Sequence, residues 1–122
     1  MNKNLVITSF LGALTIILGA FGAHALQEML SVGELKSFET AVRYQMYHVL
    51  VLLFVNTYSK FSLKTKNVIT YLFLVGILFF SGSIYAITFG ISTKFIWFIT
   101  PLGGLFLILG WLKMTLAYLK KD

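Results

Sequence analysis

Residues 5–23 read LVITSFLGALTIILGAFGA, a mostly apolar run without a charged residue. A helix needs about 20 such residues to cross the hydrocarbon core of a bilayer. Comparable runs occupy approximately residues 43–58, 68–89 and 95–118, and the four runs fill most of the 122-residue chain. The second run is short unless Arg43 and its neighbours are counted. The pattern predicts an all-α membrane protein whose four transmembrane helices form one compact bundle over residues 1–122.

The composition agrees with a lipid environment. Hydrophobic residues make up 58% of the chain and charged residues only 11%, whereas soluble domains carry about 25% charged residues. The net charge of +6 is typical of some nucleic-acid-binding proteins, but here the lysines lie in short segments between apolar runs and form no basic stripe. We therefore expect the lipid bilayer as partner, with anionic lipid as a candidate ligand and no nucleic acid.

The first run has a second interpretation as a secretory signal. A lysine precedes it, and Ala23-His24-Ala25 fits an A-x-A cleavage site. The run is longer than the usual apolar region of a signal, which has about 7–15 residues. We favour an uncleaved spanning helix.

The basic residues predict the orientation, because Lys and Arg gather in short cytoplasmic loops. If the N-terminus is inside, the outer side carries three basic residues: Lys36, Arg43 and Lys94. The inner side then carries six: Lys3, Lys60, Lys64, Lys66, Lys120 and Lys121. This bias predicts a multi-pass membrane protein with both termini in the cytoplasm.

The connection between the first two runs contains helical signals. Ser31-Val32-Gly33-Glu34 has the spacing of a capping box, and Glu39 and Arg43 are four residues apart, where they can pair. Apolar residues recur at helical spacing at Leu35, Phe38, Val42, Met46 and Val49. We expect an amphipathic extracellular helix that begins near Val32 and runs into the second span. The alternative is a helix lying flat at the interface, with a break near Arg43.

Small residues at regular spacing predict where the helices pack. Spanning helices associate by close approach of their backbones at small residues, and a seven-residue spacing keeps one seam facing a partner. Such pairs occur in three of the four runs. The predicted packing positions are Gly12, Gly19, Gly22, Gly76, Gly103 and Gly110. Pro101 predicts a kink or the first turn of the last helix, with Thr100 as its cap.

Polar residues in the predicted spans gather in the outer leaflet, and the inner halves offer little chemistry. The candidate polar pocket comprises His24, Arg43, Gln45, His48, Ser81, Ser83, Tyr85 and Thr100. One hypothesis makes His24, Arg43 and His48 the lining of an outward-facing pocket for an anion or a lipid headgroup. The other, which we favour, makes these residues hydrogen-bonding links between helices and side chains that reach the interface.

The chain lacks the residues that several classes of reaction require. The chain has no cysteine and only two histidines, so we expect no metal site, because zinc takes three or four protein ligands. None of the apolar runs contains Asp or Glu, which argues against a small proton-coupled drug exporter. The chain has no P-loop, no Ser-His-Asp set and no paired carboxylates, so we expect neither an enzyme nor a cofactor.

Four motifs in order carry a resemblance over essentially the whole chain. They are GAFGAH at 19–24, RYQMYH at 43–48, FSGSIY at 80–85 and TPLGG at 100–104. With these motifs the chain resembles the uncharacterised YwdK/YgdD-like family of small bacterial inner-membrane proteins. The resemblance implies a four-helix membrane protein and no particular activity.

Together these patterns predict a non-enzymatic integral membrane protein that supports envelope integrity or assists another membrane component. The alternative is a component of an oligomeric transporter or channel, or a binder of anions or lipid headgroups. Four short helices enclose little volume, so a transporter would need a second copy or a partner membrane protein.

Overall fold

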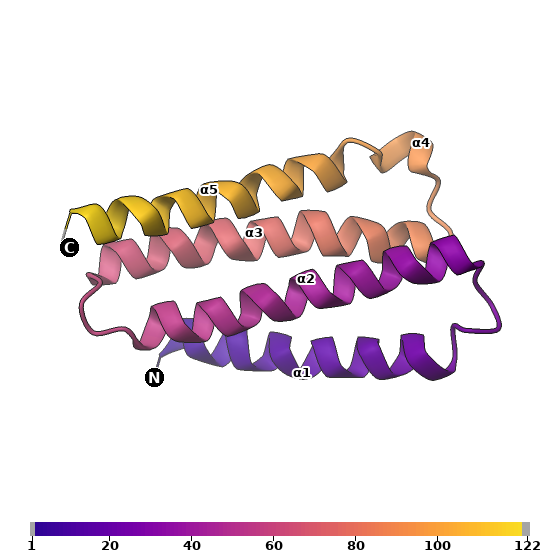
Figure 1. Ribbon diagram of the computed structural model, residues 1–122, viewed down its shortest axis with the longest axis horizontal. Helices are drawn as coiled ribbons and strands as arrows, with labels where there is room; N and C mark the ends of the chain where they lie inside the picture. The colour runs from indigo at the N-terminus through magenta and orange to yellow at the C-terminus, as the bar shows by residue number, and fades with distance from the viewer. Residues whose placement is uncertain (1, 121–122) are drawn as a thin grey trace.

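The structure is a computed structural model that describes residues 2–120, and within them it contains helices and no strand. The helices are α1 (Lys3–His24), α2 (Val32–Thr57), α3 (Leu63–Thr88), α4 (Thr93–Ile96) and α5 (Ile99–Leu119) (Figure 1). Three segments are long and apolar enough to cross a membrane: α1, α3, and residues Thr93–Leu119, which include α4 and α5. The predicted all-α class is therefore confirmed, and three of the four predicted spans qualify by length and hydropathy.

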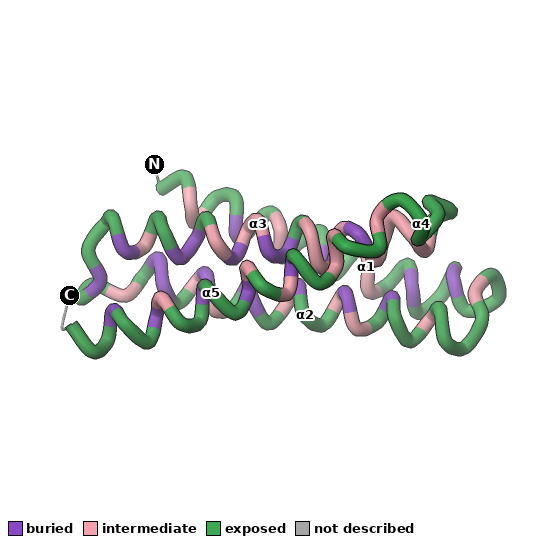
Figure 2. Tube along the Cα trace, turned by 90° about the horizontal axis from the view of Figure 1, so that it is seen from above, coloured by how far each residue is buried: buried purple, intermediate pink, exposed green. Residues whose placement is uncertain are grey.

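The four long helices run antiparallel in chain order. The main packing contacts join α1 to α2, α2 to α3, and α3 to α5. As a result α1 and α3 point the same way, and both begin at the end of the molecule where the two termini lie (Figure 1). The opposite end carries the α1–α2 connection and α4. Figure 2 shows buried positions recurring along the inner sides of the helices while their outer sides remain exposed.

Helix α2 begins where the capping signal predicts. The Ser31 hydroxyl accepts from the Glu34 backbone N–H at 3.1 Å, and the Glu34 carboxylate accepts from the Ser31 N–H at 2.9 Å. The helix then continues without interruption to Thr57, so the alternative with a break near Arg43 is wrong. The segment that we expected to form an amphipathic helix is the first part of α2, and its position outside the membrane stays a prediction. Arg43 donates to the Thr40 hydroxyl at 3.2 Å rather than pairing with Glu39.

Helix α3 begins five residues before the predicted run. Ser62 caps it by accepting from the Thr65 N–H at 3.1 Å, and the polar residues Lys64, Lys66 and Asn67 occupy its first turns. Apolar character marks only the part of a helix that meets lipid or core, so the prediction missed these turns.

The predicted fourth run, residues 95–118, divides at Trp97 and Phe98 into α4 and α5. Pro101 lies in the first turn of α5. The N–H groups of a first turn have no partner within the helix, so the N–H that proline lacks costs no helical hydrogen bond. The prediction that Thr100 caps this helix is wrong, because Thr100 lies inside α5, and Phe98 occupies the cap position without a side-chain bond.

The main core lies between α2, α3 and α5, towards the end with the termini. Its members include Leu52, Phe73 and Leu107, one from each of these helices. Towards the end of the bundle that carries α4, Phe38 is buried beside Tyr85, with ring centroids 5.3 Å apart. Buried polar residues such as Gln45, His48 and Asn56 lie along the bundle among these apolar side chains.

Candidate functional site: polar pairs between the helices

Two polar side chains of α3 contact α2. Ser81 and Tyr85 are four residues apart and share a helix face. The Ser81 hydroxyl donates to the Ala41 carbonyl at 2.7 Å, and the Tyr85 hydroxyl donates to Oε1 of Gln45 at 2.7 Å. The amide of Gln45 in turn donates to the Leu11 carbonyl of α1 at 3.3 Å. One buried glutamine therefore connects three helices.

A pair of hydroxyls joins α3 to α5. Ser83 and Thr100 hydrogen-bond each other, and the Ser83 hydroxyl also donates to the Phe80 carbonyl at 3.0 Å. A serine hydroxyl has a single proton. When the Ser83 proton points to the Phe80 carbonyl, the Thr100 hydroxyl is the donor to Ser83.

His48 lies inside the bundle, between α2 and α5. Its Nε2 accepts from the indole N–H of Trp111 at 3.1 Å, and its Nδ1 lies 2.7 Å from the Tyr44 carbonyl. An indole N–H only donates and a carbonyl only accepts. These partners require the neutral histidine tautomer that carries its proton on Nδ1. The ring of Phe73 packs against both, with centroids 5.1 Å from His48 and 5.7 Å from Trp111.

His24 and Arg43 do not join these pairs. His24 is exposed at the end of α1. Arg43 is exposed on α2, where it borders two open grooves between α1 and α2 of about 270 and 360 Å³. Glu39 lines the smaller groove. The structure thus brings Gln45 together with Tyr85 and Ser83 with Thr100, and it places His24, Arg43 and His48 apart from one another.

The glycines of α1 face side chains of α2. A Cβ added at Gly12 would lie 3.3 Å from Val49, and one at Gly22 would lie 2.6 Å from the ring of Phe38. Gly19 is looser, with Val42 at 3.5 Å.

The glycines between α3 and α5 are tighter. An added Cβ would lie 2.5 Å from Leu107 at Gly76 and 2.5 Å from Phe73 at Gly110. At Gly103 it would overlap the backbone of Phe80, which cannot rotate away as a side chain can. The two helices can be this close only because the residue at each of these points is glycine.

A second polar cluster lies at the other end of the bundle, where we expected little chemistry. The amide of Asn4 donates to the side-chain oxygens of Asn56 and Asn67, each at 2.9 Å. The Asn56 amide donates to the Thr70 hydroxyl at 2.8 Å and to the Leu52 carbonyl at 3.0 Å. This amide cluster, Asn4, Asn56, Asn67 and Thr70, joins α1, α2 and α3. Sequence reasoning missed it, although an asparagine inside the second apolar run was a usable signal.

One buried polar atom stands alone. Among residues 2–120, only the hydroxyl of Thr8 is a buried side-chain nitrogen or oxygen without a hydrogen-bond partner. The same part of the chain holds no group of three His, Cys, Asp or Glu side chains that could bind a metal.

Comparison with known proteins places the chain among bacterial membrane proteins. The UPF0382 membrane protein of Haemophilus influenzae is 35% identical over 126 residues, covering 98% of this chain and 95% of that protein. The UPF0382 membrane protein SAB0533 of Staphylococcus aureus is 40% identical over 114 residues, covering 90% of this chain and 93% of the relative. YwdK of Bacillus subtilis, also a UPF0382 membrane protein, is 35% identical over 122 residues, covering 97% and 98%.

No solved structure matches the chain. The family described as "Protein of unknown function (DUF423)" matches residues 18–104, a range that contains all four motifs quoted above. The chain therefore belongs to the DUF423 family of UPF0382 membrane proteins, which includes the YwdK-like protein of Bacillus subtilis.

Proposed function

We propose that this chain is a non-enzymatic integral protein of the bacterial cytoplasmic membrane that supports membrane integrity or assists another membrane component. One observation carries this proposal. Apart from Thr8, the buried side-chain nitrogens and oxygens of residues 2–120 have hydrogen-bond partners, and the pairs described above join one helix to another. These polar groups hold the bundle together, and the pairs Gln45–Tyr85, Ser83–Thr100 and His48–Trp111 do not line the grooves beside Arg43.

Chain continuity supports α2 as the fourth span. If α1 and α3 both cross the membrane in the same direction, the chain must return between them. Helix α2 is antiparallel to both and packs on both. Its 26 residues reach about 39 Å at 1.5 Å per residue, more than the roughly 30 Å hydrocarbon core. Its first turns, with Glu34 and Lys36, would project beyond the core on the outer side.

The charge distribution supports cytoplasmic termini. Lys3, Lys60, Lys64, Lys66 and Lys120 lie at the end of the bundle where α1 and α3 begin, and basic residues are enriched in cytoplasmic loops. Tyr58, Phe61 and Tyr118 cluster at the same end, with centroids 4.8 to 5.9 Å apart. Aromatic residues at this level are typical of a membrane–water interface.

The proposal is tested by rescue of a deletion strain under membrane stress, with entry of a membrane-impermeant dye as the readout. The deletion is expected to raise dye entry, and wild type to restore the barrier. A His24→Ala/Arg43→Ala variant at matched membrane levels is expected to restore it as well, because neither residue supports the bundle interior. Unchanged dye entry in the deletion strain contradicts a role in membrane integrity.

The grooves beside Arg43 favour one alternative. An exposed guanidinium between two open grooves could hold an anion or the headgroup of an outer-leaflet lipid. In that case the His24→Ala/Arg43→Ala variant fails to rescue although it folds. The transporter alternative requires an oligomer, so a strictly monomeric protein in native lipid counts against it.

A further inference from the structure

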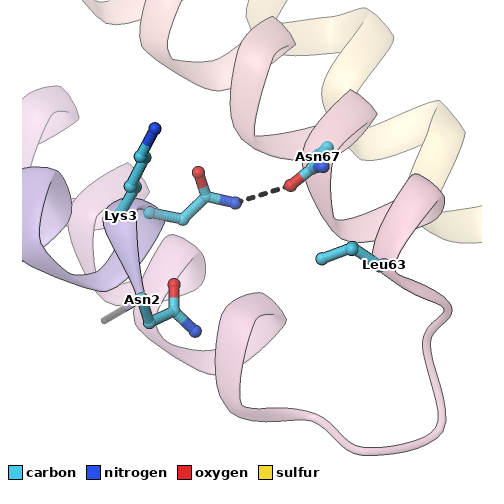
Figure 3. Close-up of a pocket in the computed structure, with 5 residues that line it drawn as sticks. Asn2, Lys3, Leu63 and Asn67 are labelled. Carbon is cyan, nitrogen blue, oxygen red and sulfur yellow. Dashed lines mark hydrogen bonds between the residues drawn. The ribbon is translucent and has the colours of Figure 1, made fainter.

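A cavity of about 600 Å³ opens between the first turns of α1 and α3. Asn2, Lys3 and Asn4 line it from the start of α1, and Leu63 and Asn67 line it from α3, with the Asn4–Asn67 hydrogen bond across it (Figure 3). It lies at the end of the bundle that carries the termini, far from the grooves beside Arg43. This terminal cavity is large enough for a small polar ligand.

The hydrogen bonds around the cavity leave donors free. Asn2 caps α1 with its oxygen, which accepts from the Leu5 N–H at 3.2 Å. Asn67 also uses its oxygen, accepting from Asn4. Among the described residues, the side-chain nitrogens of Asn2, Lys3 and Asn67 donate to no protein acceptor. Three free donors therefore surround the cavity, and one of them is cationic.

The local field also favours an anion. Helices α1 and α3 both begin here, and the N-terminus of a helix carries a positive partial charge of about half an elementary charge. Neither helix has an acidic residue in its first turn, and Lys64 and Lys66 lie beside Asn67 in the sequence. Every carboxylate side chain of the described residues, Glu28, Glu34 and Glu39, belongs to the opposite end of the bundle.

We infer that the terminal cavity binds a phosphate group, and that an anionic phospholipid of the facing leaflet supplies it. Phosphate oxygens accept hydrogen bonds from amide and ammonium donors, and charged acceptors strengthen such bonds. Leu63 favours lipid over free phosphate, because its side chain is 73% exposed on the cavity wall, where an acyl chain would run. The site does not depend on the proposed role in membrane integrity; only its assignment to the cytoplasmic leaflet rests on the proposed orientation.

Native mass spectrometry of the detergent-solubilised full-length protein tests this site with three ligands. Phosphatidylglycerol is expected to bind saturably, phosphatidylcholine with the same acyl chains is expected to bind far less, and inorganic phosphate is expected to compete only at much higher concentration. Binding in detergent does not depend on membrane orientation or on any cellular phenotype. Its failure is therefore distinguishable from failure of the rescue experiment.

Two variants alter these donors, one by replacing amides with carboxylates and one by removing the positive charge, and both are designed to keep the fold. Asn2→Asp/Asn67→Asp keeps the oxygen that caps α1 and the oxygen that binds Asn4, but it replaces both free donors with carboxylates. We expect it to abolish saturable binding of phosphatidylglycerol. Lys3→Gln should weaken binding about fivefold, the effect of removing one lysine near anionic lipid. Lys120→Gln is the control, because it removes a charge from the same end of the bundle but outside the cavity lining.

Equal binding of phosphatidylglycerol by wild type and Lys3→Gln overturns the site, as does equal retention of the two lipids. If the double variant unfolds, Lys3→Gln against Lys120→Gln still decides the question. Saturable binding of inorganic phosphate, with no added affinity for phosphatidylglycerol, overturns the lipid as the source of the phosphate.

Discussion

The hydroxyl of Tyr85 donates a 2.7 Å hydrogen bond to the side-chain oxygen of Gln45, 40 residues away in the sequence. Because the amide nitrogen of Gln45 donates to the Leu11 carbonyl, both ends of one side chain are engaged on different helices. In an apolar interior, where water cannot substitute for a lost partner, such a link fixes how α2 is rotated relative to α1 and α3.

Removal of the Tyr85 hydroxyl should destabilise the bundle modestly. Tyr85→Phe leaves the Gln45 oxygen without its partner, and hydrogen bonds between membrane helices contribute about 0.6 kcal/mol on average and up to roughly 2 kcal/mol. We expect the free energy of unfolding in detergent to fall by about 1 kcal/mol. Tyr71→Phe is the matched control, because Tyr71 is 67% exposed. Equal losses in the two variants would contradict a specific role for the Tyr85–Gln45 bond.

Two neighbouring glycines should respond very differently to alanine. At Gly103 a methyl group meets the backbone of Phe80, whereas at Gly104 the nearest atom is a side-chain carbon of Phe80 at 3.9 Å. Overpacking of this kind costs about 1–3 kcal/mol. We therefore expect Gly103→Ala to lower the unfolding temperature clearly and Gly104→Ala to leave it nearly unchanged. Similar melting curves for both variants would mean that α3 and α5 are not packed as closely as described.

A substitution at Thr8 should stabilise the protein. The Thr8 hydroxyl is fully buried and has no partner, and an unmade hydrogen bond of a buried group costs about 1–3 kcal/mol. Valine has nearly the same shape without the hydroxyl. Thr8→Val is expected to raise the free energy of unfolding by about 1 kcal/mol, as measured by chemical denaturation in micelles. Thr15→Val is the comparison, because the Thr15 hydroxyl donates to the Leu11 carbonyl at 2.8 Å. A clear loss of stability in Thr8→Val would show that this hydroxyl has an unseen partner.

The start of α2 should loosen in acid. The backbone N–H and the hydroxyl of Ser31 hold the pKa of Glu34 below its usual value. A lowered folded-state pKa means that the capping stabilisation is complete above the unfolded pKa of about 4.3 and is lost as the pH falls through the folded value. Amide hydrogen exchange near Glu34 is expected to accelerate below about pH 4. Glu34→Gln keeps an oxygen for the Ser31 N–H and should remove this pH dependence, and the same acid response in that variant would exclude Glu34 as its cause.

Local signals in the sequence predicted the ends of some helices well. The capping box at Ser31 and Glu34 involves residues three apart, so the sequence alone contains it. The extra first turns of α3 and the division before Ile99 were missed for a physical reason. Hydropathy reports the solvent of a side chain, so it misses helical turns made of polar residues such as Lys64 and Lys66. For the same reason it does not register a break between apolar residues such as Trp97 and Phe98.

The pairing of the polar residues could not be predicted from the sequence. Gln45 and Tyr85 were both candidates, but their contact depends on the rotation of α2 against α3, which apolar patterns fix only loosely. His48 was expected near the outer start of a short second span. Because α2 begins at Val32, His48 lies in its middle and reaches Trp111. Asn4, Asn56 and Asn67 come from three segments, and only the antiparallel fold brings them together.

Cysteine labelling in intact cells tests most directly whether α2 crosses the membrane and the termini are cytoplasmic. The chain has no cysteine of its own, so single cysteines can replace Lys36, Ser59, Lys94 and Lys120. A membrane-impermeant maleimide is expected to label positions 36 and 94 in intact cells and positions 59 and 120 only after lysis. Labelling of both 36 and 59 in intact cells would contradict the account, because the two ends of α2 would then lie on the same side of the membrane.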